Sequence, residues 1–375
     1  MRAGKAVLKG QTHLNKRKLM QRKTFINQIL LAGATLALPK FSFSEEIREG
    51  KKSWLYKHLH PLHRILEEEG YYVWCCSPIL ADDGKVHVFY SRWDAKKGMG
   101  GWINGSEICQ AVADGPEAAF NHFRVVLKPR GSEFWDGTTC HNPLIKKVGG
   151  KYALFYMGNN NGKTNTKRIG LSIADSLYGD FNHAEQPLLL PGPTGSWDDH
   201  CTTNPAFVKH PNGKYYLFYK SWNTEEYEHP KFPIRGNRKY GLAIAEALEG
   251  PYTKSSTNPV IDFSVLGNNE QLEDAYVWWE HQKFNMISRD MGYYGDKKGI
   301  YMNSKDGLHW SKPQFAFDDV AHYIQQPPKP KHLSKYGRFE RPQLLLDTKG
   351  KPIYLFLTTQ GGRFETSSPF VMRID

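Results

Sequence analysis

The sequence predicts an all-β protein, a five-bladed β-propeller with a short N-terminal helical segment. The first observation is a segment that recurs five times, at spacings of 65, 62, 70 and 67 residues. The second is the composition, because 13% aromatic residues together with 34 Gly and 22 Pro favour many short strands joined by turns. Four short antiparallel strands per unit, repeated at this period, are typical of propeller blades.

Each unit begins with two strands separated by a polar turn. The five segments read "CSPILADDGKVHVFYSRW", "HNPLIKKVGGKYALFYMGN", "TNPAFVKHPNGKYYLFYKSW", "EDAYVWWEHQKFNMISRD" and "ERPQLLLDTKGKPIYLFLTTQ", aligned at Pro78, Pro143, Pro205, Ala275 and Pro342. Third strands such as "RIGLSIADS" and fourth strands such as "FRVVLKP" follow. The fifth unit ends early, so we expect the segment before Pro78 to supply its missing strand and close the ring.

The chain is predicted to divide into a leader over 1–44, a helical extension over 45–70 and the propeller over 71–375. The leader holds nine basic and no acidic residues, and a basic run precedes the apolar stretch "ILLAGATLAL". Ser42-Phe43-Ser44 provides a cleavage point, which is typical of a signal peptide. We expect an exported protein, periplasmic or extracellular, without a membrane anchor after signal removal. The alternative is a buried N-terminal helix.

The net charge of +12 is concentrated in this leader. Without it, 41 basic residues stand against 38 acidic ones, so we expect no nucleic-acid partner. We also expect no cofactor and no metal, while the oligomeric state is left open. In the extension, "SWLYKHLHPLHRILEEEG" over 53–70 is predicted to be a helix that caps the ring, with Leu55, Leu59, Leu62 and Leu66 on one face.

Two sets of polar residues are expected at one mouth of the propeller channel. Inner strands begin there and second strands end there. The first set is Cys76-Ser77, His141-Asn142, Thr203-Asn204, Glu273-Asp274 and Glu340-Arg341; the second is Arg92-Trp93-Asp94, Asn159-Asn160, Ser221-Trp222, Arg289-Asp290 and Thr359-Gln360. Carboxylates mixed with Arg, His and Trp suit a carbohydrate, because aromatic faces stack on sugar rings and charged groups bind hydroxyls. Glycosidic cleavage needs two carboxyl groups.

The blade period, the acid-x-Pro strand starts and the segments "ADSLYGDF" and "AEALEGPY" resemble the five-bladed glycoside hydrolases of families 43, 62, 32 and 117, over Tyr71 to Asp375. The resemblance to family 43 implies that Glu273 is the general acid. That family has an Asp base where this alignment has Ser77, and a pKa-modulating Asp where it has Asn204. Two of the three acid positions are therefore replaced.

A repeated Trp-Asp motif offers replacements. "WDGTTCHNP" from Trp135 returns as "WDDHCTTNP" from Trp197, which puts Asp136 and Asp198 six residues before Asn142 and Asn204. We expect one of them to be the base, Asp136 in preference, with Asp198 as modulator. The alternative is that each Asp makes a turn while its Trp packs between blades.

The predicted function is an exported glycoside hydrolase that is exo-acting on a plant or algal oligosaccharide, with an anionic glycan left open. The catalytic residues would be Glu273 with Asp136 and Asp198. The substrate would contact His141, Asn142, Asn204, Trp93, Asp94, Trp222, Asp274, Glu340 and Arg341. Two alternatives are a polysaccharide lyase, in which His141 or a Tyr takes a proton beside a uronate held by Arg341, and a sugar-binding propeller without activity.

Overall fold

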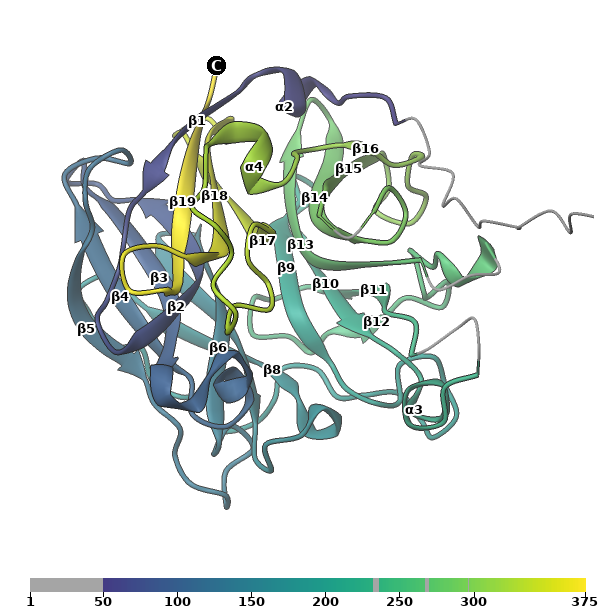
Figure 1. Ribbon diagram of the computed structural model, residues 1–375. Coiled ribbons are helices and arrows are strands. Elements are labelled where there is room, and N and C mark those ends of the chain that lie inside the picture. The colour runs from purple at the N-terminus through teal and green to yellow at the C-terminus, as the bar shows by residue number, and fades with distance from the viewer. Residues whose placement is uncertain (1–49, 232–235, 267–269, 296) are drawn as a thin grey trace, which may run out of the picture. The chain divides into compact units, whose positions relative to one another are not determined.

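The computed structural model describes residues 50–231, 236–266, 270–295 and 297–375 (Figure 1). The chain divides into two units, Met1–Glu46 and Ile47–Asp375, and the second contains all the described residues. The predicted leader lies outside them. Among the described residues, no helix is both long enough and apolar enough to cross a membrane.

Five antiparallel sheets confirm the predicted five-bladed propeller. Four sheets continue directly along the chain: β2 Tyr71–Leu80, β3 Val86–Asp94, β4 Glu107–Ala113 and β5 Asn121–Leu127; β6 Thr139–Val148, β7 Lys151–Asn159 and β8 Arg168–Ala174; β9 Thr203–Lys209, β10 Tyr215–Ser221, β11 Lys239–Ala245 and β12 Thr253–Lys254; β13 Gln271–Glu280, β14 Lys283–Met291, β15 Gly299–Ser304 and β16 Gln314–Phe315. The inner strand of each sheet contacts the inner strand of the next, so the blades surround a common axis.

The fifth sheet joins the two ends of this unit. It consists of β17 Glu340–Leu346, β18 Pro352–Gly361, β19 Thr366–Ile374 and β1 Leu59–Arg64. Figure 1 shows β1 in purple beside β19 in yellow, and Leu59 pairs with Ile374. The prediction that a segment before Pro78 completes the fifth blade is therefore confirmed.

The helix predicted over 53–70 is corrected by the structure. Only α2, Trp54–Lys57, is helical, with the Tyr56 N–H donating to the Ser53 hydroxyl at 3.2 Å. The chain then extends into β1, whose Pro61 lacks the N–H that a helix interior needs. The remaining helices are short: α3 Thr224–Glu228, α4 Val320–Tyr323, and the 3₁₀ turns η1 Ala95–Lys97, η2 Met99–Ile103, η3 Thr164–Thr166 and η4 Ser264–Leu266.

Every inner strand bends at one residue with a positive φ that is not glycine. These residues are Cys75 (53°), Asn142 (54°), Asn204 (49°), Asp274 (61°) and Arg341 (55°), each beside a shift in strand register. Such a conformation costs on the order of 1–3 kcal/mol and persists only where the surroundings enforce it. The five equivalent bends show that the chain uses the same device in every blade.

The register corrects the sequence alignment of the first blade by two residues. Cys75, and not Ser77, occupies the place of Asn142, Asn204, Asp274 and Arg341. The Ser77 hydroxyl instead accepts a hydrogen bond from the Ile145 N–H at 3.0 Å and donates to Gln343 at 3.3 Å. The alignment failed here because Pro78 was matched to the other prolines, whereas Cys76 occupies their structural position.

The five bent residues are linked to one another by hydrogen bonds around the axis. Asn142 donates to Asn204 at 3.2 Å, and Asn204 donates to Asp274 at 2.7 Å. Arg341 donates to Asp274 at 3.0 Å and to the Cys75 sulfur at 3.1 Å. We call Cys75, Asn142, Asn204, Asp274 and Arg341 the axial ring; it includes one buried side chain from each blade.

The Trp-Asp motif of the second blade fastens a loop to β7. The Trp135 ring lies 5.4 Å from the Tyr156 ring, and its N–H donates to the Ala184 carbonyl at 2.9 Å. The fully buried Asp136 accepts from Tyr156 at 2.9 Å and from Arg130 at 2.8 Å. Gly170 leaves room for both rings, since a Cβ there would lie 2.6 Å from each.

The third blade repeats this arrangement. The Trp197 ring lies 5.7 Å from the Tyr219 ring, and Asp198 accepts from Tyr219 at 2.8 Å and from Lys254 at 2.6 Å. Gly241 takes the place of Gly170. The repeated motif therefore has a structural role in both blades.

Replacing Asp136 by Asn should destabilise the fold, because Arg130 loses its buried charged partner. We expect the free energy of unfolding in urea to fall by about 1.5–3 kcal/mol, the usual contribution of hydrogen bonds to charged groups. Asp198→Asn should have a similar effect, and the exposed Asp94→Asn should not. Unchanged stability of both motif variants would contradict the structural role.

The axial ring should behave as one unit. Arg341→Met leaves a buried carboxylate without its cation, which typically costs about 3–5 kcal/mol. Combining it with Asp274→Leu should cost less than the sum of the two single variants, because the second change removes the stranded charge. Urea unfolding of the four proteins measures this difference; strictly additive losses would show that the two side chains do not depend on each other.

Candidate active site

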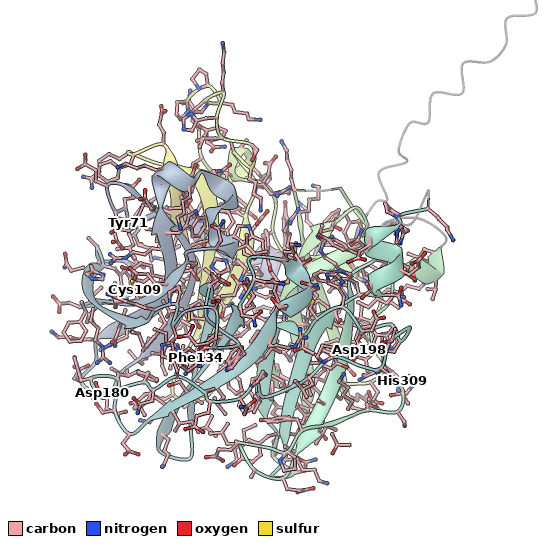
Figure 2. The ribbon with its side chains drawn as sticks, turned by 90° about the horizontal axis from the view of Figure 1, so that it is seen from below. Tyr71, Cys109, Phe134, Asp180, Asp198 and His309 are labelled. Atoms are coloured by element: carbon pink, nitrogen blue, oxygen red, sulfur yellow. The ribbon has the colours of Figure 1, made fainter. Side chains whose placement is uncertain are left out.

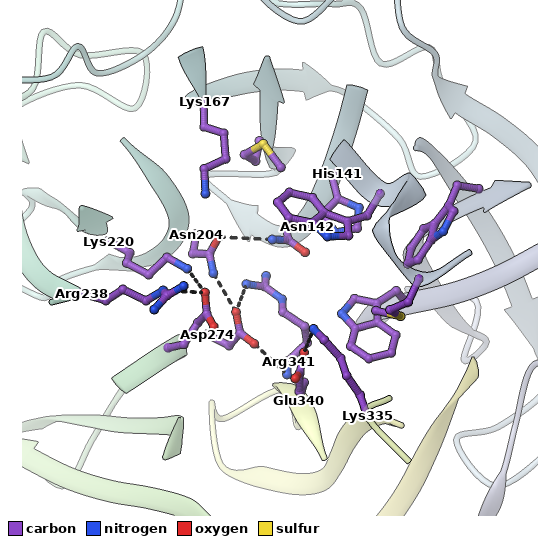
Figure 3. A pocket seen from close by; sticks show the side chains of 16 residues that line it. His141, Asn142, Lys167, Asn204, Lys220, Arg238, Asp274, Lys335, Glu340 and Arg341 are labelled. Carbon is purple, nitrogen blue, oxygen red and sulfur yellow. Dashed lines mark hydrogen bonds and ion pairs between the residues drawn. The ribbon is translucent and has the colours of Figure 1, made fainter. Parts of the chain in front are cut away.

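A pocket opens at the end of the channel where the axial ring lies (Figure 3). Its cavity volume is about 160 Å³. The lining comprises sixteen residues: Trp74, Trp93, Met99, Trp102, His141, Asn142, Met157, Lys167, Asn204, Lys220, Arg238, Glu273, Asp274, Lys335, Glu340 and Arg341. Four of the five axial-ring residues belong to this lining, so the ring forms the floor of the pocket.

One wall of the pocket is aromatic. The Trp102 ring stacks on His141 with centroids 5.4 Å apart, and Trp93 meets His141 edge-on at 5.6 Å. Trp93 is itself stacked on Tyr72 at 5.4 Å and contacts Trp74 at 6.4 Å. Trp102 comes from η2, and Trp93 from the end of β3. Aromatic surfaces of this kind suit the apolar faces of a sugar ring.

His141 is a neutral group within this wall. Its Nδ1 lies 2.9 Å from the Ser106 hydroxyl oxygen, and the side chain is buried. Burial holds the pKa of His141 well below its usual range, and the positive charges of Arg341, Lys167 and Lys335 lower it further. The imidazole is therefore uncharged near neutral pH.

Glu273 faces three cations. They are Lys220 on β10, Arg238 before β11, and Arg289 on β14. The Arg289 Nη1 lies 3.1 Å from one carboxylate oxygen and the Arg238 Nε 3.5 Å from the other. Burial alone would raise the pKa of Glu273, but these charges outweigh it and hold the pKa well below the usual range. The carboxyl group is therefore ionised.

Glu340 is in a similar state. Its carboxylate pairs with Arg289 at 3.2 Å, with Lys335 at 3.2 Å, and with Arg338. Burial raises the pKa of Glu340, whereas the charges of Lys335, Arg289 and Arg338 lower it, and the net effect is a lowered pKa. Arg289 bridges the two glutamates, so both carboxylates lie beside one guanidinium group.

Lys167 differs from the other cations of the pocket. It follows η3, is 4% exposed, and projects into the pocket in Figure 3. Its Nζ lies 4.5 Å from the centroid of the Trp222 ring. Burial lowers the pKa of Lys167 to about 8. Among the described residues, no carboxylate lies within ion-pair distance of this ammonium group.

The structure gathers most of the residues that the sequence predicted for the site. Those that line the pocket are Glu273, His141, Asn142, Asn204, Trp93, Asp274, Glu340 and Arg341. All of them except Trp93 lie at or next to the bend of an inner strand, which brings equivalent positions to the axis, and Trp93 lies at the end of β3.

The placement of Asp136 and Asp198 at the pocket is corrected. Neither lines it; Asp198 is labelled in Figure 2. Asp136 is fully buried, and His183, Arg130 and Tyr156 take its oxygens at 2.8–2.9 Å. Burial is outweighed by these hydrogen bonds, so the pKa of Asp136 is lowered. A carboxylate enclosed in this way is not in position to activate a water in the pocket.

Asp94 and Trp222 are corrected in the same way. Asp94 is exposed and accepts a hydrogen bond from the Lys96 N–H at 2.8 Å, which caps η1. Trp222 is buried behind Lys167, with its ring stacked on His200 at 5.2 Å. Neither residue is part of the lining.

Sequence reasoning missed the cations Lys167, Lys220, Arg238 and Lys335, and the side chains of Trp74, Met99, Trp102 and Met157. Lys220 had a usable signal, since it precedes the predicted Ser221-Trp222 by one residue and alternation along a strand decides which side chain faces inward. Lys167, Lys335 and Trp102 lie in connections between strands, where no periodic pattern exists.

One group in the described part of the chain has the composition of a metal site. The ligand atoms of Asp136, Cys140 and His183 lie within 4.8 Å of one another. However, the guanidinium group of Arg130 lies 2.8 Å from the same carboxylate and would repel a cation. We therefore assign no metal to this group.

No family model matches the sequence, and no curated protein matches it. Solved structures do match. Zg3597, a family 117 glycoside hydrolase of the marine bacterium Zobellia galactanivorans, has a TM-score of 0.62 at 18% identity, over 86% of this chain and 91% of that one.

Two further similar structures are described as family 43 enzymes. The GH43_1 enzyme from Xanthomonas citri, complexed with xylotriose, has a TM-score of 0.55 at 14% identity, over 85% of this chain and 91% of that one. CoXyl43, a GH43 beta-xylosidase/alpha-arabinofuranosidase from a compost microbial metagenome, has a TM-score of 0.54 at 17% identity, over 87% and 95% of the two chains.

At these identities the likeness concerns the fold. The chain has the five-bladed propeller fold that is found in glycoside hydrolases of families 117 and 43.

Proposed function

We propose that the protein is a glycoside hydrolase that binds the end of an oligosaccharide in the pocket at the mouth of the channel. The observation that carries this proposal is the combination of two ionised glutamates, Glu340 buried and Glu273 partly buried, with an aromatic wall in one cavity. Carboxylates act on the glycosidic bond, and aromatic faces hold the sugar ring. The fold shared with glycoside hydrolases supports the proposal.

The size of the pocket favours exo action. Its volume of about 160 Å³ is below the roughly 300–1,000 Å³ of pockets that enclose drug-sized ligands. One terminal sugar unit therefore occupies it, while the rest of the chain lies outside. Export to the periplasm or the cell exterior is part of the proposal and rests on the residues of the leader.

Glu273 is the carboxylate that we assign to the reaction. Resemblance to family 43 implies a general acid at this position, but a general acid must carry a proton, and three cations keep Glu273 ionised. An ionised carboxylate suits the other role, in which it activates a water or attacks the sugar. We propose that Glu273 acts in this role.

We propose that His141 donates the proton to the leaving oxygen. His141 lines the same pocket, and its ordinary titration range is near neutral pH. In the structure, burial and the charges of Arg341, Lys167 and Lys335 lower its pKa. A negative charge bound near these cations would offset their effect and raise the pKa of His141 toward the range that proton donation requires.

Glu273→Gln tests the assignment directly. On a panel of plant and algal oligosaccharides, kcat should fall by about 10²–10⁴-fold, the usual contribution of general acid–base groups. The control is Glu246→Gln, an exposed glutamate that pairs with Lys214 away from the pocket, and it should keep full turnover. Equal turnover of both variants would exclude Glu273 from the reaction.

The pH dependence distinguishes the two roles of Glu273. If the ionised form acts, kcat/KM should hold as the pH falls to about 4.3, the ordinary pKa of Glu, and decline only below it, because the folded-state pKa is lowered. If the protonated form acts, kcat/KM should instead fall as the pH rises through the lowered folded-state pKa of Glu273. Circular dichroism at each pH separates titration from unfolding.

A polysaccharide lyase is a second candidate because His141, the base of that alternative, lines the pocket in its neutral form. The predicted uronate ligand Arg341 is, however, already held by Asp274 and Cys75 in the axial ring. Ultraviolet absorbance of an unsaturated product would identify a lyase, and saturated products would exclude it. Binding without any turnover across the panel would favour the non-catalytic sugar-binding propeller.

A further inference from the structure

We infer that the pocket recognises a negatively charged substituent on its sugar, either the carboxylate of a uronic acid or a sulfate ester, and that Lys167 binds it. The inference rests on the proposed function in one respect: it takes the occupant of the pocket to be a sugar.

The lining carries more positive than negative charge. Five cationic side chains (Lys167, Lys220, Arg238, Lys335 and Arg341) face three carboxylates (Glu273, Asp274 and Glu340). Arg289 and Arg338 lie behind them and pair with the same glutamates. Every carboxylate of the lining already has a cationic partner, so the remaining field in the cavity is positive and attracts an anion.

Lys167 is the cation of this lining that forms no ion pair with another described residue. Lys167 is buried, with an exposed fraction of 4%. Lys220, Arg238 and Lys335 each contact a glutamate, and Arg341 contacts Asp274; in the described part of the chain, Lys167 contacts no carboxylate. A buried ammonium group without a partner is costly, and a ligand anion would remove that cost.

The backbone of Lys167 is held on both sides. Its N–H donates to the Thr164 carbonyl at 3.2 Å, and its carbonyl accepts from the Thr202 N–H at 3.2 Å and from Arg168 at 2.7 Å. These bonds fix the backbone of Lys167, and burial and the contact with Trp222 restrict its side chain, which reduces the entropy lost on binding.

The distance to the aromatic wall fits a sugar. The Lys167 Nζ lies 5.8 Å from the centroid of the Trp102 ring, which stacks on His141. A sugar ring resting against this wall would bring a substituent within reach of the ammonium group. Asn142, on the floor, has a buried side-chain oxygen without a hydrogen-bond donor in the structure and is available to a hydroxyl of the same ring.

A structural role for Lys167 is the alternative, since its ammonium group also lies over Trp222. A cation–π contact compensates only in part for the loss of hydration. A cation–π contact with Trp222 also does not explain why the Lys167 ammonium group lies at the cavity or why cations outnumber carboxylates in the lining.

The test measures binding of glucuronate, of a glucose sulfate and of glucose by calorimetry at low salt. The wild-type protein should bind one of the two anions at least about tenfold more tightly than glucose, as expected for a charge-assisted hydrogen bond. Comparing the two anions shows which substituent the site prefers. Equal binding of all three compounds would overturn the inference without any variant.

The variants locate the effect. Lys167→Met should abolish the preference for the anion and leave glucose binding unchanged, whereas Lys167→Arg should retain most of the preference. Lys163→Met is the matched control, because it removes the same charge from an exposed position four residues away. A preference that survives in a folded Lys167→Met protein would overturn the role of Lys167.

The outcomes also separate this inference from the proposed function. Hydrolysis of a neutral oligosaccharide, with KM unaffected by Lys167→Met, would keep the glycosidase and overturn the anion site. It would also overturn the assignment of His141 as proton donor, because that assignment needs a bound negative charge. Anion-dependent sugar binding that is lost in Lys167→Met, without turnover of any glycan, would keep the anion site and overturn the glycosidase.

Discussion

The axial ring is the interaction on which the rest of this structure depends. Each inner strand adopts an unfavourable backbone conformation at one residue, and the side chains of these residues are joined by hydrogen bonds across the axis. A propeller has no continuous core along its axis, so its blades must be held together by such contacts and by apolar packing between neighbouring sheets. Asp274 and Arg341 are also the charged members of the pocket floor. Fold and candidate site therefore share one set of residues.

Charge balance explains the state of the carboxylates above this floor. Glu340 is buried and Glu273 is largely shielded from solvent, and loss of hydration by itself would favour their protonated forms. Lys220, Arg289 and Lys335 reverse that preference, and both groups are ionised. The chemistry of the pocket is thus set by cations from several blades. A positive cavity with ionised carboxylates suits a substrate that brings its own negative charge.

The Trp-Asp repeat shows that a structural motif can be mistaken for a catalytic one when only the sequence is considered. Asp136 and Asp198 have the residue type of a catalytic base and occur shortly before the inner strands. The structure uses them instead to fasten loops to Tyr156 and Tyr219. Their repetition in two blades, each time with a tyrosine and a cationic side chain as partners, is what an architectural role requires, whereas a catalytic role needs only one copy.

The sequence alone determined the number of blades, the strand order and the closure of the ring, because these follow from periodicity and from the missing strand of the last unit. It also placed Glu273, His141 and Glu340 at the pocket, since the inner strands of a propeller begin at one mouth of the channel. Only the tertiary structure showed that Cys75, and not Ser77, belongs to the axial ring. The bend in the inner strand sets the register of the first blade, and an alignment based on the prolines cannot detect it. The tertiary structure alone brought Lys167 to the pocket, because that residue lies in a connection between strands, where position depends on packing and not on period.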